Sequence, residues 1–169
     1  MAFAGIAGFA ALARRDERTA RLAANLLQGA ARALREDRGL RVLPSMGNAV
    51  MLEGPDAYGM AEALLELHCA FPALSRAHGL PLLALQTGVH RGEVVEAPDG
   101  SLGGPGAILA SRLQSHAAGG QVACSLAFAR AAGLGPGRVR RLGTLAGSPG
   151  DRPLACYGLV ETPRDATAA

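Results

Sequence analysis

The amino-acid sequence predicts a single α+β domain in which helices cover a central, mostly antiparallel sheet. Apolar residues recur at helical spacing in two long segments, residues 9–38 and 56–78. Shorter apolar runs, bounded by Gly, Pro and Asn, lie between and after them and are typical of strands. The first six elements follow the order β-α-β-β-α-β, which matches a split β-α-β (ferredoxin-like) core. No linker divides residues 1–161, so we expect one domain.

The first half of the chain is predicted to supply this core. Its strands and helices are predicted at residues 2–6, 9–38, 40–46, 49–53 and 56–78. Gly39 ends the first long helix, because glycine readily adopts the left-handed conformation of a helix C-cap. Gly47 and Asn48 lie between two strands, where such a pair is typical of a hairpin turn. The second long helix begins at Asp56, and Pro72 is expected to kink it or to split off its last turn.

The second half of the chain is predicted to extend the sheet. Its strands are predicted at residues 82–89, 93–97, 121–125, 138–145 and 154–160, with short helices that end near residues 118 and 133. The strands at 82–89 and 93–97 are predicted to form a second antiparallel pair. Residues 162–169 are expected to be a disordered tail, since chain ends often fray.

The composition excludes several classes of protein. Hydrophobic residues make up 49% of the chain and charged residues 18%, which excludes a disordered body. No apolar run approaches the roughly 18 residues that a membrane span needs. No basic segment precedes the first apolar stretch, as it would in a signal peptide. We therefore expect a cytoplasmic protein without a membrane partner.

The cysteines and the remaining reactive side chains predict no further chemistry. Cys69, Cys124 and Cys156 are far apart and lack CxxC spacing, which argues against a zinc site or a disulfide framework. The net charge is only +3 and aromatic residues are 4% of the chain, so nucleic-acid binding is not expected. Ser125 has no evident His and Asp partners, so no hydrolase triad is predicted. His90 is interpreted as a structural residue.

Four short stretches combine glycines with apolar residues in a distinctive order. They are FAGIAGFA at residues 3–10, SMGNAVM at 45–51, TGVHRGEV at 87–94, and GPGAILASRL at 104–113 followed by GQV at 120–122. Together they resemble the motifs F-x-D-I-x-G-F-T, K-x-x-G-D-x-V-M, G-I-H-x-G-E-V, and G-x-x-V-N-x-A-x-R-L with G-Q-V, of the catalytic domain of class III adenylate and guanylate cyclases. The resemblance runs from residue 2 to about residue 161. It implies the α+β fold of that family, with Gly5 and Asn48 side by side in the sheet.

The chain departs from this family at the residues that carry its chemistry. In the family two aspartates hold two metal ions, and those positions hold Gly5 and Asn48 here. The family's base-reading lysine falls on Pro44, its later lysine falls near Ala146, and its transition-state asparagine falls on Ile108. The chain contains no lysine at all, so no lysine elsewhere can take the place of either of these two family lysines. Because divalent cations of this kind are held mainly by carboxylate oxygens, the resemblance implies an eroded catalytic site without metal.

Some parts of the nucleotide site need none of the missing side chains. Arg112 is the same residue type as in the family, and its guanidinium would suit a bound phosphate. The alternative is that Arg112 is an ordinary helix arginine whose stem packs on the sheet. In the family, the turn after the first strand presents backbone N–H groups to the phosphates, and the resemblance implies the same role here. The alternative is that Gly8 only shapes the turn from strand to helix. The nucleotide-binding candidates are therefore Ile6, Ala7, Gly8, Phe9, Ala10, Gly47, Asn48 and Arg112.

These residues predict a catalytically degenerate cyclase homologue that binds a purine nucleotide, ATP rather than GTP, in a sensing or regulatory role. No cofactor is required, and ATP is expected to bind with magnesium weak or absent. The alternative is a pure interaction domain that pairs with itself or with an active cyclase and binds no nucleotide. The resemblance implies head-to-tail pairs, so the expected assembly is a homodimer or a heterodimer with a cyclase domain, and the alternative is a monomer.

Overall fold

The computed structural model describes residues 1–43, 47–54, 56–98, 102–146 and 153–160. Its strands are β1 (Ala2–Ile6), β2 (Arg41–Leu43), β3 (Ala49–Glu53), β4 (Leu85–Val89), β5 (Val95–Glu96), β6 (Leu102–Gly103), β7 (Val122–Ser125), β8 (Val139–Leu145) and β9 (Leu154–Leu159). Its helices are α1 (Phe9–Arg15), α2 (Glu17–Arg38), α3 (Ala57–Ala77), α4 (Pro105–His116) and α5 (Leu126–Ala131), with a short 3-10 helix η1 (Pro136–Arg138). Pro44 and the predicted tail at 162–169 lie outside the described residues. No helix in the described ranges is long and apolar enough to cross a membrane.

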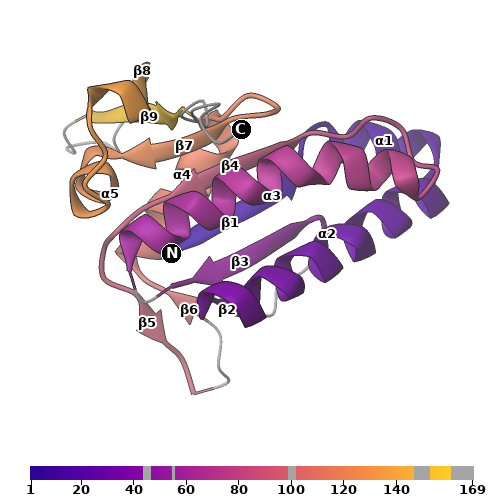
Figure 1. Cartoon of the computed structure of the whole chain (residues 1–169), viewed down its shortest axis with the longest axis horizontal. Helices are drawn as coiled ribbons and strands as arrows, with labels where there is room; N and C mark the ends of the chain where they lie inside the picture. The colour runs from indigo at the N-terminus through magenta and orange to yellow at the C-terminus, as the bar shows by residue number, and fades with distance from the viewer. Residues whose placement is uncertain (44–46, 55, 99–101, 147–152, 161–169) are drawn as a thin grey trace, which may run out of the picture.

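A seven-stranded sheet in the order β2-β3-β1-β4-β7-β9-β8 forms the centre of the molecule (Figure 1). Neighbouring strands are antiparallel except β4 and β7, which run parallel. The predicted α+β fold, with a central and mostly antiparallel sheet covered by helices, is therefore confirmed.

Helices α2 and α3 cover one face of the sheet, and α4 covers the other. In β1, the residues Ala2, Ala4 and Ile6 are buried in one core cluster with residues of α2 and α3. Gly5 faces the opposite way, since a β-carbon built on it would contact Gln114 of α4. The fully or nearly buried residues that α2 and α3 contribute to the cluster are Ala23, Leu27, Ala31, Leu34, Met60, Ala61, Ala63, Leu64, Leu67 and Phe71.

Helix α4 packs directly on the backbone of β4. A β-carbon on Gly88 would lie 2.1 Å from both the carbonyl oxygen of Ala110 and the backbone nitrogen of Gln114. Any side chain at this crossing would push the helix away from the strand, so the close approach requires glycine. This approach also brings Gln114 over β1, beside Gly5.

The first long helix is interrupted, contrary to the prediction of one helix over residues 9–38. Asp16 adopts an extended conformation between α1 and α2, with φ −155° and ψ 92°. Its carboxylate accepts hydrogen bonds from the backbone N–H of Thr19 at 2.9 Å and from the Thr19 hydroxyl at 2.6 Å. These bonds satisfy donors at the start of α2, so Asp16 ends one helix and caps the next.

Pro72 does not split the second long helix, because α3 continues from Ala57 to Ala77 with Pro72 inside it. Proline has no backbone N–H, so one hydrogen bond of the helix is lost at Pro72. The nearby side chains of Leu67 and Phe71 are almost fully buried in the core. The hydroxyl of Ser75 donates to the carbonyl oxygen of Phe71 at 2.8 Å. Core packing therefore holds the helix together across the proline.

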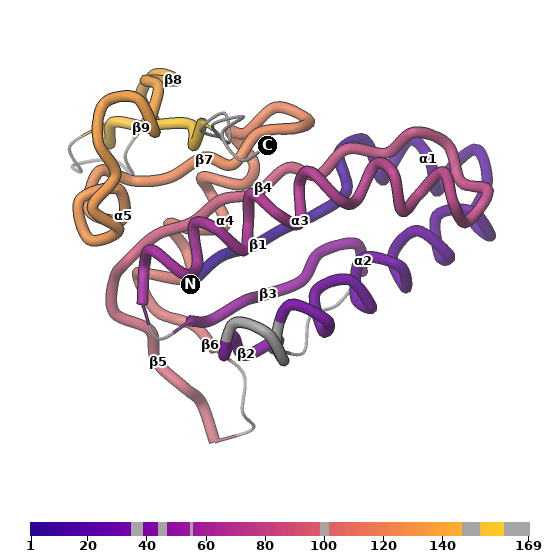
Figure 2. The backbone as a smooth tube through the Cα atoms, in the orientation of Figure 1, coloured from indigo at the N-terminus to yellow at the C-terminus, as the bar shows by residue number. Residues whose placement is uncertain are grey.

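The predicted pairing of residues 82–89 with 93–97 is wrong. Both edges of β4 are occupied, by β1 and by β7. Strand β5 therefore pairs with β6 instead, in a two-stranded hairpin that projects from the body of the molecule (Figures 1 and 2).

Candidate functional site

Gly5 and Asn48 lie side by side, as the sequence predicts. Gly5 pairs with Ala49 between the antiparallel strands β1 and β3. The backbone N–H of Ile6 donates to the carbonyl oxygen of Asn48 at 3.2 Å. This region of the sheet is where the resemblance places two metal-binding aspartates.

The amide of Gln114 occupies the space beside Gly5. A β-carbon on Gly5 would lie 2.4 Å from Nε2 of Gln114 and 3.5 Å from the carbonyl oxygen of Asn48. A neutral amide thus stands where a longer side chain at position 5 would begin. Within the described ranges, no group of three or more His, Cys, Asp or Glu side chains could hold a metal ion. The residues at this place do not fit a divalent cation, which prefers carboxylate oxygens.

The turn between β1 and α1 has fewer free amides than the sequence suggests. The N–H of Ile6 is bonded to Asn48, and the N–H of Ala7 donates to the carbonyl oxygen of Ala84 at 2.9 Å. Neither group is free to bind a phosphate, so these two candidates fail as backbone donors. The amides of Gly8, Phe9 and Ala10 begin helix α1, where N–H groups lack helical acceptors.

Glycine at position 8 is required by backbone conformation. Its φ is +69°, in the left-handed region, and a β-carbon there would meet nothing within 4 Å. Gly47, at the start of the turn before β3, likewise has a φ of +85° and open space around it. Both glycines therefore shape turns, and neither marks a place where another part of the chain packs closely.

Arg112 and Ile108 lie one turn apart on α4. Ile108 is 61% exposed, and its apolar side chain cannot donate the hydrogen bond of the asparagine that the resemblance places there. The guanidinium of Arg112 donates to the carbonyl oxygen of Ala146, which follows β8. Arg112 therefore has an internal acceptor in this chain.

Ser125 does have a histidine partner, which the sequence analysis did not find. The hydroxyl oxygen of Ser125 lies 2.7 Å from Nδ1 of His90. Because Val89 pairs with Cys124 between the parallel strands β4 and β7, the residues that follow them meet at the same end of the sheet. Parallel pairing of these strands was the missing signal.

The His90–Ser125 pair is not a hydrolase site. Ser125 is fully buried, and its hydroxyl oxygen accepts the backbone N–H of Phe128 at 3.2 Å as the N-cap of α5. No carboxylate hydrogen-bonds His90 among the described residues. Burial lowers the pKa of His90, and the nearby amino group of Met1 lowers it further, so the ring is neutral at pH 7.

Three cavities lined by described residues lie away from Gly5 and Asn48. Their volumes are about 470, 320 and 260 Å³. None of the three is lined by Gly5, Gly8, Asn48 or Arg112. These three cavities therefore do not include the predicted nucleotide site.

The sequence matches no protein-family model and no curated protein, whereas solved structures match closely in shape. The guanylyl cyclase Cya2 superposes with a TM-score of 0.78 at 19% identity, over 97% of this chain and 93% of that chain. The adenylyl cyclase CyaB from P. aeruginosa gives a TM-score of 0.75 at 23% identity, over 97% and 94% of the two chains. The catalytic core of a rhodopsin-guanylyl cyclase with converted specificity, in complex with ATPαS, gives a TM-score of 0.74 at 17% identity. The match covers 94% of this chain and 92% of that chain. Likeness at this level of identity establishes the fold.

Proposed function

The chain has the fold of class III adenylate and guanylate cyclase domains, and we propose that it is a catalytically degenerate homologue that binds a purine nucleotide. In this proposal ATP is favoured over GTP, no metal-dependent cyclisation follows, and the domain has a sensing or regulatory role in the cytoplasm. The observation that carries the proposal is the group of Gly5, Asn48 and Gln114, which contains no carboxylate at the place of the two metal-binding aspartates.

The loss of catalysis follows from charge. Two metal ions in a transfer site of this kind clamp the attacking and leaving oxygens and neutralise the phosphates. Gly5 contributes no side chain, and Asn48 and Gln114 contribute neutral amides. A cation at this place would lose most of its hydration without gaining an anionic ligand, so the clamp does not form.

Nucleotide binding is supported by what remains. One solved structure with the same fold is a complex with ATPαS, so the fold can accommodate a purine nucleotide. The amides of Gly8, Phe9 and Ala10 lack helical acceptors at the start of α1 and can donate to phosphate oxygens. Neutral donors alone make this interaction weaker than a metal-assisted one.

The second candidate function is a protein-interaction domain that binds no nucleotide. It is favoured by Ile108, an apolar side chain that is 61% exposed on α4. At an interface this side chain would add apolar contact area, in place of the hydrogen bond of the asparagine that the resemblance expects. In this alternative the domain pairs with itself or with an active cyclase.

Calorimetric titration with ATP and with GTP, each with and without magnesium, separates the two candidates. Saturable ATP binding that does not require magnesium supports the proposal, and no heat at about 10 mM nucleotide, well above a millimolar Kd, leaves the interaction domain. The Gly8→Asp variant should weaken ATP binding at least tenfold, because a carboxylate would face the phosphates. Gly79→Asp is the matched control, since Gly79 has the same φ of +69° and the same open surroundings. Light scattering of the same samples at micromolar concentration reports whether the chain is a dimer.

A further inference from the structure

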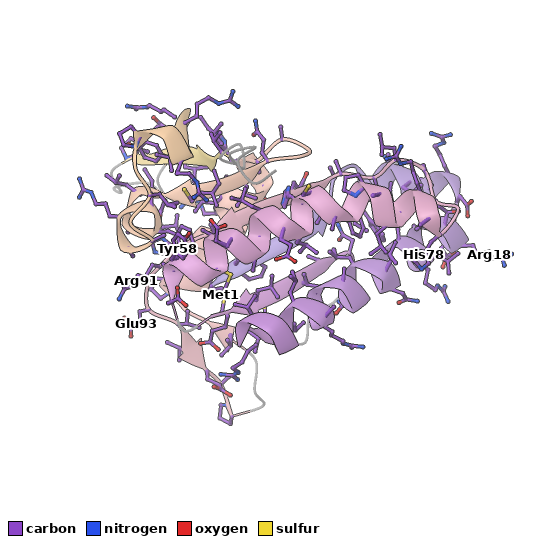
Figure 3. The ribbon with its side chains drawn as sticks, viewed as in Figure 1. Met1, Arg18, Tyr58, His78, Arg91 and Glu93 are labelled. Atoms are coloured by element: carbon purple, nitrogen blue, oxygen red, sulfur yellow. The ribbon has the colours of Figure 1, made fainter. Side chains whose placement is uncertain are left out.

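The largest of the three cavities lies at the opposite end of the sheet from the eroded site. Its volume is about 470 Å³, and its lining includes Glu53, Asp56, Met60, His90, Arg91 and Phe128. The strands β3 and β4 end at this cavity, whereas Gly5 lies toward the far end of β1. Figure 3 shows Met1, Tyr58, Arg91 and Glu93 at one end of the molecule and Arg18 and His78 at the other. The cavity is thus separate from the surface to which the proposed function belongs.

The cavity has an apolar floor and a polar rim. Met60 and Phe128, each only 2% exposed, belong to the main core and reach the cavity from α3 and α5. The polar groups belong to Glu53, Asp56, the loop that follows β4 and the amino group of Met1, which donates to the carbonyl oxygen of His90 at 3.0 Å. The lining is thus mixed, with more polar than apolar surface, and its volume lies within the range of small-molecule sites.

The two carboxylates of the rim are already engaged. The Glu53 carboxylate forms an ion pair with the guanidinium of Arg41 at 2.9 Å. The Asp56 carboxylate caps α3 and accepts the backbone N–H of Gly59 at 2.6 Å. Because both carboxylates already have partners within the protein, neither depends on a cationic ligand.

Arg91 is the cation of the rim that has no such partner. Its side chain is exposed, and no ion pair or hydrogen bond of its guanidinium occurs with any described residue. A guanidinium offers several donors in a planar fork that matches carboxylate oxygens. The guanidinium donors of Arg91 are therefore available to a ligand at this cavity.

His90 adds a neutral donor beside Arg91. The hydroxyl of Ser125 is buried and needs an acceptor for its proton, and Nδ1 of His90 lies 2.7 Å away. We therefore assign Ser125 as the donor to Nδ1, which places the ring proton of His90 on Nε2. Nε2 lies over Gly92, another residue of the cavity wall, because a β-carbon on Gly92 would be only 2.4 Å from it.

We propose that this cavity is a binding site for a small organic carboxylate with an apolar body. The carboxylate contacts the guanidinium of Arg91 and the Nε2–H of His90. The apolar body rests on Met60 and Phe128. The site is independent of nucleotide binding and of metal, and it does not involve the residues of the eroded site.

The test is a titration of the ¹⁵N-labelled chain with three matched probes, benzoate, benzamide and benzylamine, followed by NMR. Benzoate should produce saturable shifts at residues 57–60 and 90–94, with a Kd of about 1 mM for a ligand of so few atoms. Benzamide and benzylamine should bind at least tenfold more weakly. Equal or tighter binding of either control overturns the assignment of an anion, and no saturable shift at these residues overturns the site.

Variants identify the side chains that bind the probe. Arg91→Gln should weaken benzoate at least tenfold, whereas Arg18→Gln, at the far end of the molecule, should leave its affinity unchanged (Figure 3). Gly92→Ala should also weaken benzoate, because the new methyl group displaces the imidazole of His90 while the backbone is unaffected. Retained binding in Arg91→Gln, with a native spectrum, contradicts the proposal. ATP titrations of the same variants report on the proposed nucleotide function separately, because no residue changed here belongs to that surface.

Discussion

Nε2 of Gln114 lies 2.4 Å from the point where a β-carbon on Gly5 would stand, so the two positions cannot both carry ordinary side chains without movement. The atom in the way is the end of a flexible side chain, and it can be displaced. An aspartate at position 5 therefore requires the amide of Gln114 to move away from this position.

We expect the Gly5→Asp, Asn48→Asp double variant to gain magnesium-dependent ATP binding, and the further change Gln114→Ala to enlarge that gain. The first two changes add carboxylates, which a divalent cation prefers as ligands. Gln114→Ala removes the amide that obstructs the space beside position 5. Calorimetry with ATP at several magnesium concentrations measures the gain. Gln114→Ala alone is the control and should not make binding depend on magnesium. A double variant as insensitive to magnesium as the parent would refute the alignment of Gly5 and Asn48 with the metal site.

The crossing of α4 over β4 predicts a large cost for Gly88→Ala. The added methyl would lie 2.1 Å from two backbone atoms of α4, which cannot rotate away as a side chain can. Overpacking of this kind typically costs about 1–3 kcal/mol, and more where backbone must shift. Equilibrium unfolding in urea measures the cost.

Gly29→Ala should have the opposite sign and is the control for Gly88→Ala. Gly29 lies inside α2, is exposed and has nothing within 4 Å of a built β-carbon. Alanine is favoured over glycine inside a helix by about 1 kcal/mol. If Gly88→Ala were as stable as the parent, the close packing of α4 on β4 would be wrong.

His68 predicts a loss of stability on acidification. Its Nε2 lies 2.8 Å from the hydroxyl of the buried Thr87, and its Nδ1 has no hydrogen-bond partner in the described part of the chain. Burial lowers the pKa of His68 from 6.5 to about 4. The unfolded chain therefore binds a proton at this residue that the folded chain does not bind between those two pH values.

The free energy of unfolding should fall as the pH falls from about 6.5 to about 4, with a contribution from His68 of at most about 1.4 kcal/mol per pH unit. Above pH 6.5 this contribution vanishes. His68→Gln should remove that part of the slope, whereas the exposed His78→Gln should leave it in place. Urea unfolding at several pH values measures both slopes, and identical slopes for the parent and His68→Gln would contradict the neutral buried ring.

Local patterns were enough to predict much of the fold. Asp56 caps α3 as its position before an apolar helical stripe suggests, and its side chain accepts the N–H of Gly59. Strands β2 and β3 pair as the predicted hairpin requires, Arg41 with Glu53 and Leu43 with Met51, and residues 44–46 between them lie outside the described residues. These features depend on residues close in sequence, so spacing alone reveals them.

Sequence reasoning missed one local relationship, at Asp16, and two that join distant parts of the chain. Asp16 ends α1 although the helical spacing continues through it, because its carboxylate bonds to Thr19 and competes with the helix. The contact of Gln114 with Gly5 joins α4 to β1, and the contact of His90 with Ser125 joins two parallel strands. No local pattern encodes which side chains such crossings bring together.

The last prediction concerns catalysis. We expect the purified domain to form neither cyclic AMP nor cyclic GMP above background, with magnesium or with manganese. Electrostatic stabilisation is usually the largest catalytic effect, and one lost donor can cost about 10²–10³ in rate. In the proposed alignment, Gly5 and Asn48 stand where the family has two carboxylates, and Ile108 stands where it has a hydrogen-bond donor. The double variant Gly5→Asp, Asn48→Asp should bind metal better yet still turn over little, because Ile108 remains. Chromatography of the products after long incubation measures this, and activity of the parent chain that disappears in Arg112→Ala would refute the degenerate assignment.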